Sequence, residues 1–190
     1  MGKEKYQKKI ETLFRKSLIV NSKSIERIVK DKQYTKQLIR NLMLRKKIYR
    51  LTKGCYSIYD ESSLVVFCFK PAYLGLQDSL SFYNLWEQET IPIIITTRRV
   101  RQGIRNVFGI NVLIRRVKKE YLFGYEFHKE GSFYLPYSDI EKTFIDMVYF
   151  KERLNEETRK NIMKKINKKK LSLYLKNYPK KFQRKIFENF

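Results

Sequence analysis

Charge is distributed unevenly along this chain of 190 residues, and this restricts how the chain can fold. Residues 1–60 carry 17 basic and 5 acidic side chains, a net charge of +12. Residues 61–150 carry 11 basic and 10 acidic side chains, a net charge of +1, and residues 151–190 carry 14 basic and 4 acidic side chains, a net charge of +10. A near-neutral middle between two basic ends predicts a polyanion-binding module, a separate middle domain and a basic C-terminal element.

The total formal charge of +23 makes a polyanion the expected partner, with nucleic acid ahead of an anionic membrane surface. The alternative is the composition of an AT-rich genome, since Lys is abundant and Ala72 is the sole alanine. Codon bias would load all three segments alike, so the uneven charge favours a functional origin. Apolar residues make up 43% of the chain, which argues against disorder.

The sequence offers little for metal binding or membrane insertion. Cys55 and Cys68 lack the nearby His or Cys-x-x-Cys that a four-ligand zinc site needs. The sequence leaves a disulfide between them as an alternative, but it favours interpreting both as small apolar residues of strands. Apolar stretches of about 6–7 residues fall short of the roughly 20 that span a bilayer. We therefore expect a soluble, cytoplasmic protein with no metal, no cofactor and no membrane partner.

The first sixty residues alternate helical and extended patterns. An apolar stripe at helical spacing runs from Tyr6 to Leu18, and 18–20 reads as extended. A short helix through Ile25 and Val29 follows, then a turn at 31–33. Thr35 is a candidate N-cap for a third helix, whose buried stripe consists of Leu38, Ile39, Leu42 and Met43.

Two extended runs at 48–51 and 55–59 flank Gly54, which supplies the positive φ of a tight hairpin. Helix, strand, two helices and a hairpin are the element order of a winged helix-turn-helix. In that fold one helix enters the major groove of DNA and the hairpin lies along the backbone. We therefore expect residues 1–60 to form a winged helix-turn-helix DNA-binding domain.

Polar residue types on the third helix and the hairpin suit DNA contact. Arginine, lysine and amide side chains pair with base edges or phosphates. The residues concerned are Lys36, Gln37, Arg40, Asn41, Arg45, Arg50 and Lys53. For each residue alone a solvated helix face is the simpler interpretation, but for the whole set DNA contact is favoured.

Residues 61–190 predict a small α/β domain with a mixed sheet, ending in basic helices. Strands are expected at 63–69, 91–97, 110–117 and 123–127, and a helix at 76–83. Ser138 and Glu141 predict a capping box for a further helix. Arg98, Arg99, Arg101 and Arg105 form a basic loop, a possible second basic surface. Apolar stripes in 151–190 predict two or three short helices. The fold class expected is α+β.

Five segments in order resemble the AbiE-type abortive-infection antitoxin family (AbiEi) of transcriptional regulators, from type IV toxin–antitoxin systems. They are 53–59, 75–85, 91–99, 116–126 and 138–146. The resemblance implies a winged helix that represses its own operon at a double-stranded operator, expected to be an inverted repeat. It also implies a C-terminal domain that antagonises a nucleotidyltransferase-like toxin. By the same match, Thr35 and Thr52 join Lys36, Gln37, Arg40, Arg50 and Lys53 as DNA contacts.

Enzyme chemistry has weak support in the sequence. Gly131-Ser132 resembles a nucleotidyltransferase turn, but the carboxylates that follow, Asp139 and Glu141, fall in the predicted capping box. His128 has no partner for general acid–base work and is interpreted as structural. We expect no catalytic residues. A stand-alone transcriptional regulator and an RNA- or ribonucleoprotein-binding basic protein remain alternative functions.

Overall fold

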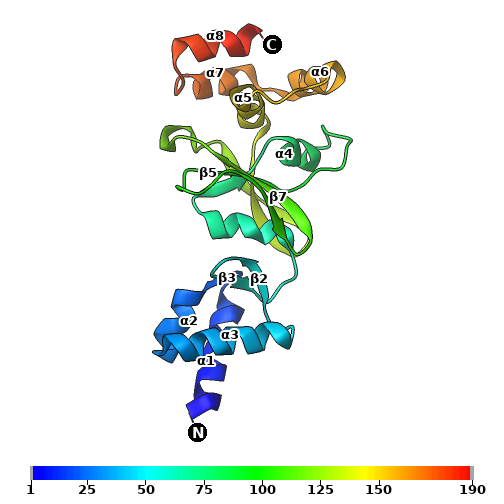
Figure 1. Ribbon diagram of the computed structural model, residues 1–190. Helices are drawn as coiled ribbons and strands as arrows, with labels where there is room; N and C mark the ends of the chain where they lie inside the picture. The colour runs from blue at the N-terminus through cyan, green and yellow to red at the C-terminus, as the bar shows by residue number, and fades with distance from the viewer. Residues whose placement is uncertain (1, 189–190) are drawn as a thin grey trace. The chain divides into compact units, whose positions relative to one another are not determined.

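The computed structural model describes residues 2–188 (Figure 1). The chain divides into two units. The N-terminal unit comprises Met1–Cys68 together with Asn106–Ile110, and the C-terminal unit comprises Phe69–Arg105 and Asn111–Phe190. The N-terminal unit therefore extends beyond residue 60 and includes a short segment from later in the chain.

In the part that the structure describes, the N-terminal unit contains three α-helices and a three-stranded antiparallel sheet of order β1-β3-β2, followed by a 3₁₀ helix. Gly54 takes a φ of 77° between β2 and β3, as expected for the hairpin, and its carbonyl accepts the N–H of Ser22 at 2.9 Å. The elements are α1 (Gly2–Lys16), β1 (Val20–Asn21), α2 (Ser22–Val29), α3 (Lys32–Leu44), β2 (Tyr49–Thr52) and β3 (Cys55–Ser57).

The expected start of α3 was wrong. The carboxylate of Asp31 accepts the N–H of Tyr34 at 2.8 Å, so Asp31 is the N-cap and the helix begins at Lys32. Thr35 lies in the next turn, where it is buried and its hydroxyl donates to the carbonyl of Asp31 at 2.6 Å. The predicted turn at 31–33 is therefore the first turn of the helix.

The apolar stripes predicted for these helices form the core of the N-terminal unit. Ile10 and Phe14 of α1, Ile25 of α2 and Ile39 of α3 are buried in one cluster. Burial of these apolar side chains away from water is the main favourable contribution to the free energy that holds the three helices together.

Residues 62–69 form a 3₁₀ helix, η1 (Ser62–Phe69), instead of the expected buried strand. The carboxylate of Glu61 accepts hydrogen bonds from both the N–H and the hydroxyl of Ser63, which favours a helical start. A continuous apolar run has no alternation, so its periodicity does not distinguish a strand from a buried helical segment.

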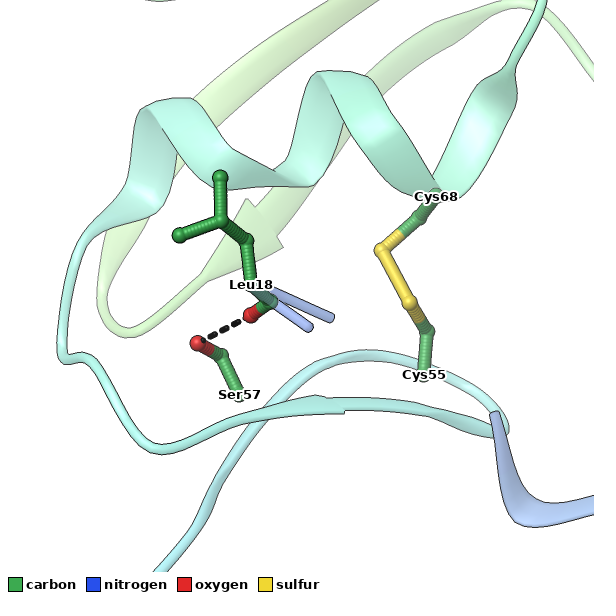
Figure 2. Close-up of a disulfide and its surroundings, with 4 residues drawn as sticks. All are labelled: Leu18, Cys55, Ser57 and Cys68. Atoms are coloured by element: carbon green, nitrogen blue, oxygen red, sulfur yellow. Dashed lines mark hydrogen bonds between the residues drawn. A yellow bond between two sulfur atoms is a disulfide. The ribbon is translucent and has the colours of Figure 1, made fainter. Parts of the chain in front are cut away.

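The two cysteines form a disulfide, which corrects the interpretation of them as free apolar residues. Cys55 lies on β3 and Cys68 on η1, so the bond ties the hairpin to the segment that follows it (Figure 2). Next to it, the hydroxyl of Ser57 donates to the carbonyl of Leu18 at 2.8 Å. Both interactions anchor β3 within the N-terminal unit.

The C-terminal unit is built on a mixed six-stranded sheet of order β6-β7-β5-β4-β9-β8. Strand β5 runs parallel to β7 and antiparallel to β4, and it is buried along its whole length, as expected of a central strand. Strands β4, β6 and β9 were not predicted. The strands are β4 (Ala72–Leu74), β5 (Ile93–Thr96), β6 (Gly103–Val107), β7 (Ile110–Arg116), β8 (Tyr125–Glu130) and β9 (Phe133–Ser138).

Helix α5 (Ile140–Phe150) is the central helix of this unit, and it does not begin with the predicted capping box. Asp139 is the N-cap, because its carboxylate accepts the N–H of Lys142 at 2.7 Å. Ser138 is the last residue of β9, and the carboxylate of Glu141 accepts the N–H of Asn167 instead.

The remaining helices are α4 (Gln77–Phe82), α6 (Glu156–Lys165), α7 (Lys168–Leu175) and α8 (Lys180–Glu188), with a short 3₁₀ turn η2 (Lys119–Tyr121). Helices α6, α7 and α8 each contact α5 (Figure 1). Ile162, Leu171, Leu175 and Ile186 are buried on these helices, so the predicted C-terminal helices are confirmed. No helix formed by the described residues combines the length and apolar surface needed to cross a bilayer.

Candidate nucleic-acid interface

Helix α3 exposes the polar residues that the sequence selected. Thr35 and Ile39 point into the core, which leaves Lys36 and Arg40 one turn apart on the exposed side. Thr35 is 3% exposed, so its side chain is not available to contact a partner. The structure therefore removes Thr35 from the predicted contacts and keeps the long cationic side chains beside it.

The exposed side of α3 divides into two ridges. Gln37, Asn41 and Arg45 follow each other at four-residue spacing and line a hollow of about 260 Å³ that also involves residues of α1. Lys36 and Arg40 are not among the residues that line this hollow. A partner that approaches α3 therefore meets one cationic ridge and one ridge of amide and guanidinium groups.

The β2–β3 hairpin carries the other predicted contacts. Arg50 and Lys53 are exposed, and Thr52 is half-buried beside Cys55 in the register of the two strands. Within the part of the chain that the structure describes, Arg40, Arg50 and Lys53 form no ion pair with a carboxylate. Their charge is therefore not neutralised within the protein, and it is available to a polyanion.

The second basic surface predicted from the sequence is only partly a common surface. Arg105 lies on β6 and is half-buried, and its guanidinium donates to the carbonyl of Arg101 at 2.9 Å and lies 5.5 Å from the Phe69 ring centre. Arg98, Arg99 and Arg101 are exposed in the loop before β6. The structure thus assigns Arg105 to local packing and leaves three exposed arginines.

A buried polar cluster on α5 escaped the sequence analysis. The ammonium group of Lys142 is completely buried and pairs with the carboxylate of Asp146. The hydroxyl of Tyr73 donates to Asp146 at 2.6 Å, and Lys142 donates to the hydroxyl of Tyr178 at 3.1 Å. Burial raises the pKa of Asp146 above its ordinary value, and Lys142 opposes that shift.

Asp139 and Glu141, the carboxylates weighed for catalysis, belong to the attachment of α7. Lys170 lies 3.0 Å from Asp139 and 3.4 Å from Glu141, and the hydroxyl of Tyr174 donates to Asp139 at 2.7 Å. These contacts use the carboxylates to fasten one helix to another. For the buried Lys142–Asp146 pair, the signal in the sequence was a Lys and an Asp four residues apart on a helix that is mostly apolar.

His128 lies on β8 with its ring packed 5.0 Å from that of Phe82, and its Nε2 atom is 3.4 Å from the hydroxyl of Tyr83. Across residues 2–188, no three His, Cys, Asp or Glu side chains are grouped so that they could hold a metal ion. The contacts of His128 are those of a packed aromatic residue.

No protein-family model matches the sequence, and no curated protein matches it. Among solved structures, the chain is similar to the crystal structure of the RV2827C protein from Mycobacterium tuberculosis, with a TM-score of 0.55. The two share 10% sequence identity, and the match covers 95% of this chain and 74% of that one. At this identity the likeness concerns the fold alone.

Proposed function

We propose that the chain is a sequence-specific DNA-binding transcriptional repressor whose N-terminal unit is a winged helix-turn-helix. The observation that carries the proposal is the order α1-β1-α2-α3-β2-β3, together with exposed cations on α3 and on the hairpin. Arg40, Arg50 and Lys53 among them form no ion pair with a carboxylate of the described residues. In a winged helix-turn-helix, the second helix of the pair enters the major groove and the hairpin follows the backbone.

The exposed residues divide between reading bases and holding phosphates. Arg40 on α3 is suited to a bidentate contact with guanine, and Gln37 and Asn41 on the adjacent ridge are suited to adenine. Arg50 and Lys53 on the hairpin are suited to phosphates, which position the protein without reading sequence. Thr52 is half-buried next to the hairpin turn, where it pairs with Cys55 and supports the register.

We further propose that this repressor is the antitoxin of a toxin–antitoxin operon. The support is the ordered resemblance to AbiE-type regulators, whose segments include the central strand β5 and the helix α5. On this proposal the N-terminal unit represses its own operon at an inverted repeat, and the C-terminal unit antagonises a nucleotidyltransferase-like toxin. No catalytic step is assigned to the chain.

Gel-shift titration with the DNA upstream of its own gene tests the repressor proposal against a shuffled duplex of equal length. With about six phosphate contacts, the logarithm of the affinity should fall with the logarithm of salt at a slope near −5. Arg40→Ala should weaken the free energy of binding to the operator by about 1–3 kcal/mol and change the binding to the shuffled duplex little. Lys53→Ala should weaken both duplexes alike, and Arg116→Ala in the C-terminal unit serves as the control.

Equal affinity for the operator and the shuffled duplex would refute specific repression, and preference for a structured RNA would favour the RNA-binding alternative. The antitoxin role has its own test. Co-expression with a nucleotidyltransferase-like protein encoded next to this gene should restore growth when that protein is toxic. If growth is not restored while operator binding persists, the chain is a stand-alone regulator.

A further inference from the structure

The C-terminal helices carry a charge that the N-terminal unit does not explain. Residues 151–190 contain 14 Lys and Arg side chains against 4 Glu. Most of these cations are exposed, on α6, α7, α8 and the segment between α5 and α6. We call them together the C-terminal basic surface.

Most of these cations lie on helices that pack against the core, and not on a flexible tail. Ile162 of α6, Leu171 and Leu175 of α7, and Ile186 of α8 are buried in the same core as α5. The backbone beneath the lysines is therefore fixed, and the charges have a defined arrangement before any partner binds. A preformed surface binds without the entropic cost of ordering a disordered segment.

Ion pairs among the described residues can neutralise only part of this surface. Lys170 is held by Asp139 and Glu141, and Lys160 lies 3.9 Å from Glu156. The four Glu of the segment are far too few for its 14 cations. Lys168 and Lys169 also stand in the first turn of α7, where the helix dipole disfavours positive charge. The positions of Lys168 and Lys169 therefore do not stabilise α7 through its dipole.

The surface is hollowed where α5 ends. A cavity of about 470 Å³ is lined by residues of α5, the segment after it, α6 and α8. Its lining includes the apolar side chains of Phe144 and Met147 and the carboxylates of Glu152 and Glu156. Four cations also line it and leave a net positive charge, namely Lys151, Arg153, Arg159 and Lys185. Positive charge around a concave site with apolar walls focuses the electrostatic potential more strongly than a flat surface does.

We propose that the C-terminal basic surface is a second nucleic-acid interface, which binds the phosphate backbone of duplex DNA without reading its sequence. Eleven of the 14 cations are Lys, a point charge without the planar fork with which Arg reads guanine. Tyr178 is buried, and Tyr174 and Phe182 are half-buried against the core. Among the described aromatic residues of this surface only Phe187 on α8 is exposed, and one ring does not provide the row of rings on which a single-strand binder stacks successive bases. The choice of DNA over duplex RNA rests on the proposed function.

The test measures binding of the full chain to a shuffled DNA duplex by fluorescence anisotropy over a series of salt concentrations. The variant Lys169→Gln/Lys176→Gln/Lys181→Gln removes three exposed charges, from α7, from its C-cap and from α8. Its affinity at low salt should fall at least about tenfold, and the salt slope should flatten by about 2–3. Lys151→Gln/Arg153→Gln should weaken binding in the same direction if the cavity holds a phosphate.

The matched control is Arg116→Gln/Lys119→Gln/Lys129→Gln, which removes the same charge from exposed positions elsewhere in the C-terminal unit. This variant should stay within about twofold of the unmodified chain, because only contacting charges release counterions. Thermal melting of each variant confirms that it is folded. Equal losses in the control and the α7–α8 variant would overturn the proposal, because net charge alone would then explain the binding.

Two further measurements separate this interface from the repressor proposal. Arg40→Ala should leave the affinity for the shuffled duplex nearly unchanged, and the α7–α8 variant should keep its preference for the operator. If the unmodified chain binds the operator and the shuffled duplex equally well, specific repression is refuted, but the proposal of a second interface is not. Tighter binding of duplex or single-stranded RNA through the same lysines would overturn the assignment to DNA.

Discussion

Removing the disulfide should destabilise the N-terminal unit by an amount that follows from the loop it closes. Cys55 and Cys68 are separated by 13 positions, and the loop between them contains the end of the hairpin and most of η1. In the chain-entropy model, cross-linking two residues removes conformations from the unfolded chain and leaves the folded state in place. Breaking the bond returns those conformations to the unfolded state.

For a loop of this length the chain-entropy relation gives an entropy change of about −10 cal/mol/K, or about 3 kcal/mol at room temperature. Both cysteines are also buried, with 3% and 8% of their surface exposed. The double variant Cys55→Ala/Cys68→Ala loses the bond and some packing, so its loss should equal or exceed that of the reduced protein. A loss of about 3 kcal/mol is a large fraction of the stability of a small domain.

Urea denaturation of the full chain, followed by a far-ultraviolet signal, measures this effect with and without a thiol reductant. Because the sulfur atoms are buried, the protein should be unfolded in reductant and refolded before the measurement. The unmodified chain should lose about 3 kcal/mol on reduction, whereas Cys55→Ala/Cys68→Ala should not respond to the reductant. An unchanged midpoint on reduction of the unmodified chain would refute the loop argument.

Two predictions concern the C-terminal unit. Lys142→Met should lower the free energy of unfolding by about 3–5 kcal/mol, because it leaves the carboxylate of Asp146 buried without its cationic partner. Urea denaturation measures this loss, and the double variant Lys142→Met/Asp146→Leu should recover part of it. Asp78 accepts the N–H of Ile93 at 3.0 Å, and burial raises the pKa of its carboxyl group to about 7. The protonated carboxyl group therefore stabilises the fold fully below its ordinary pKa near 4. This stabilisation is lost as the pH rises to about 7. Because Asp78 is partly exposed, we expect a loss of about 2 kcal/mol, which Asp78→Asn should abolish; equal pH dependence in the two proteins would contradict this.

The helices were predictable because their apolar spacing is a direct consequence of burial. The stripe through Ile10 and Phe14 and the one through Ile162 and Ile166 each face a core in the structure. The strand at Ile93–Thr96 was equally clear, since a β-branched run is typical of a strand with neighbours on both sides. These helices and this strand could be predicted because the pattern that indicates each of them lies within the element itself.

Element boundaries were less predictable because neighbouring polar residues compete for the same role. Thr35 and Ser138 were the expected caps, and Asp31 and Asp139 took their places by accepting N–H groups three residues ahead. A carboxylate is the stronger acceptor for the free N–H groups of a first turn. Strand β9 was missed because it contains Pro136, which is tolerated opposite β8 in this sheet.

The candidate interface was predictable in composition but not in arrangement. Exposed Lys36 and Arg40 followed from the helical period, whereas the division of α3 into two ridges depends on how α1 packs against it. The disulfide and the Lys142–Asp146 pair join residues whose proximity or burial requires the folded chain. Spacing alone does not determine which polar residues become buried.

The near-neutral middle of the chain and its two basic ends have one physical explanation in the structure. Carboxylates of the C-terminal unit are used internally: Asp146 by Lys142, Glu152 by Arg115, and Asp139 with Glu141 by Lys170. Much of the charge that remains lies on α3 with its hairpin and on the C-terminal basic surface, and these two differ in chemistry. The first combines guanidinium and amide groups that discriminate bases, and the second is mostly lysine. We therefore expect substitutions on α3 to change which DNA is bound, and substitutions on α6–α8 to change how tightly any duplex is bound and how steeply salt weakens it.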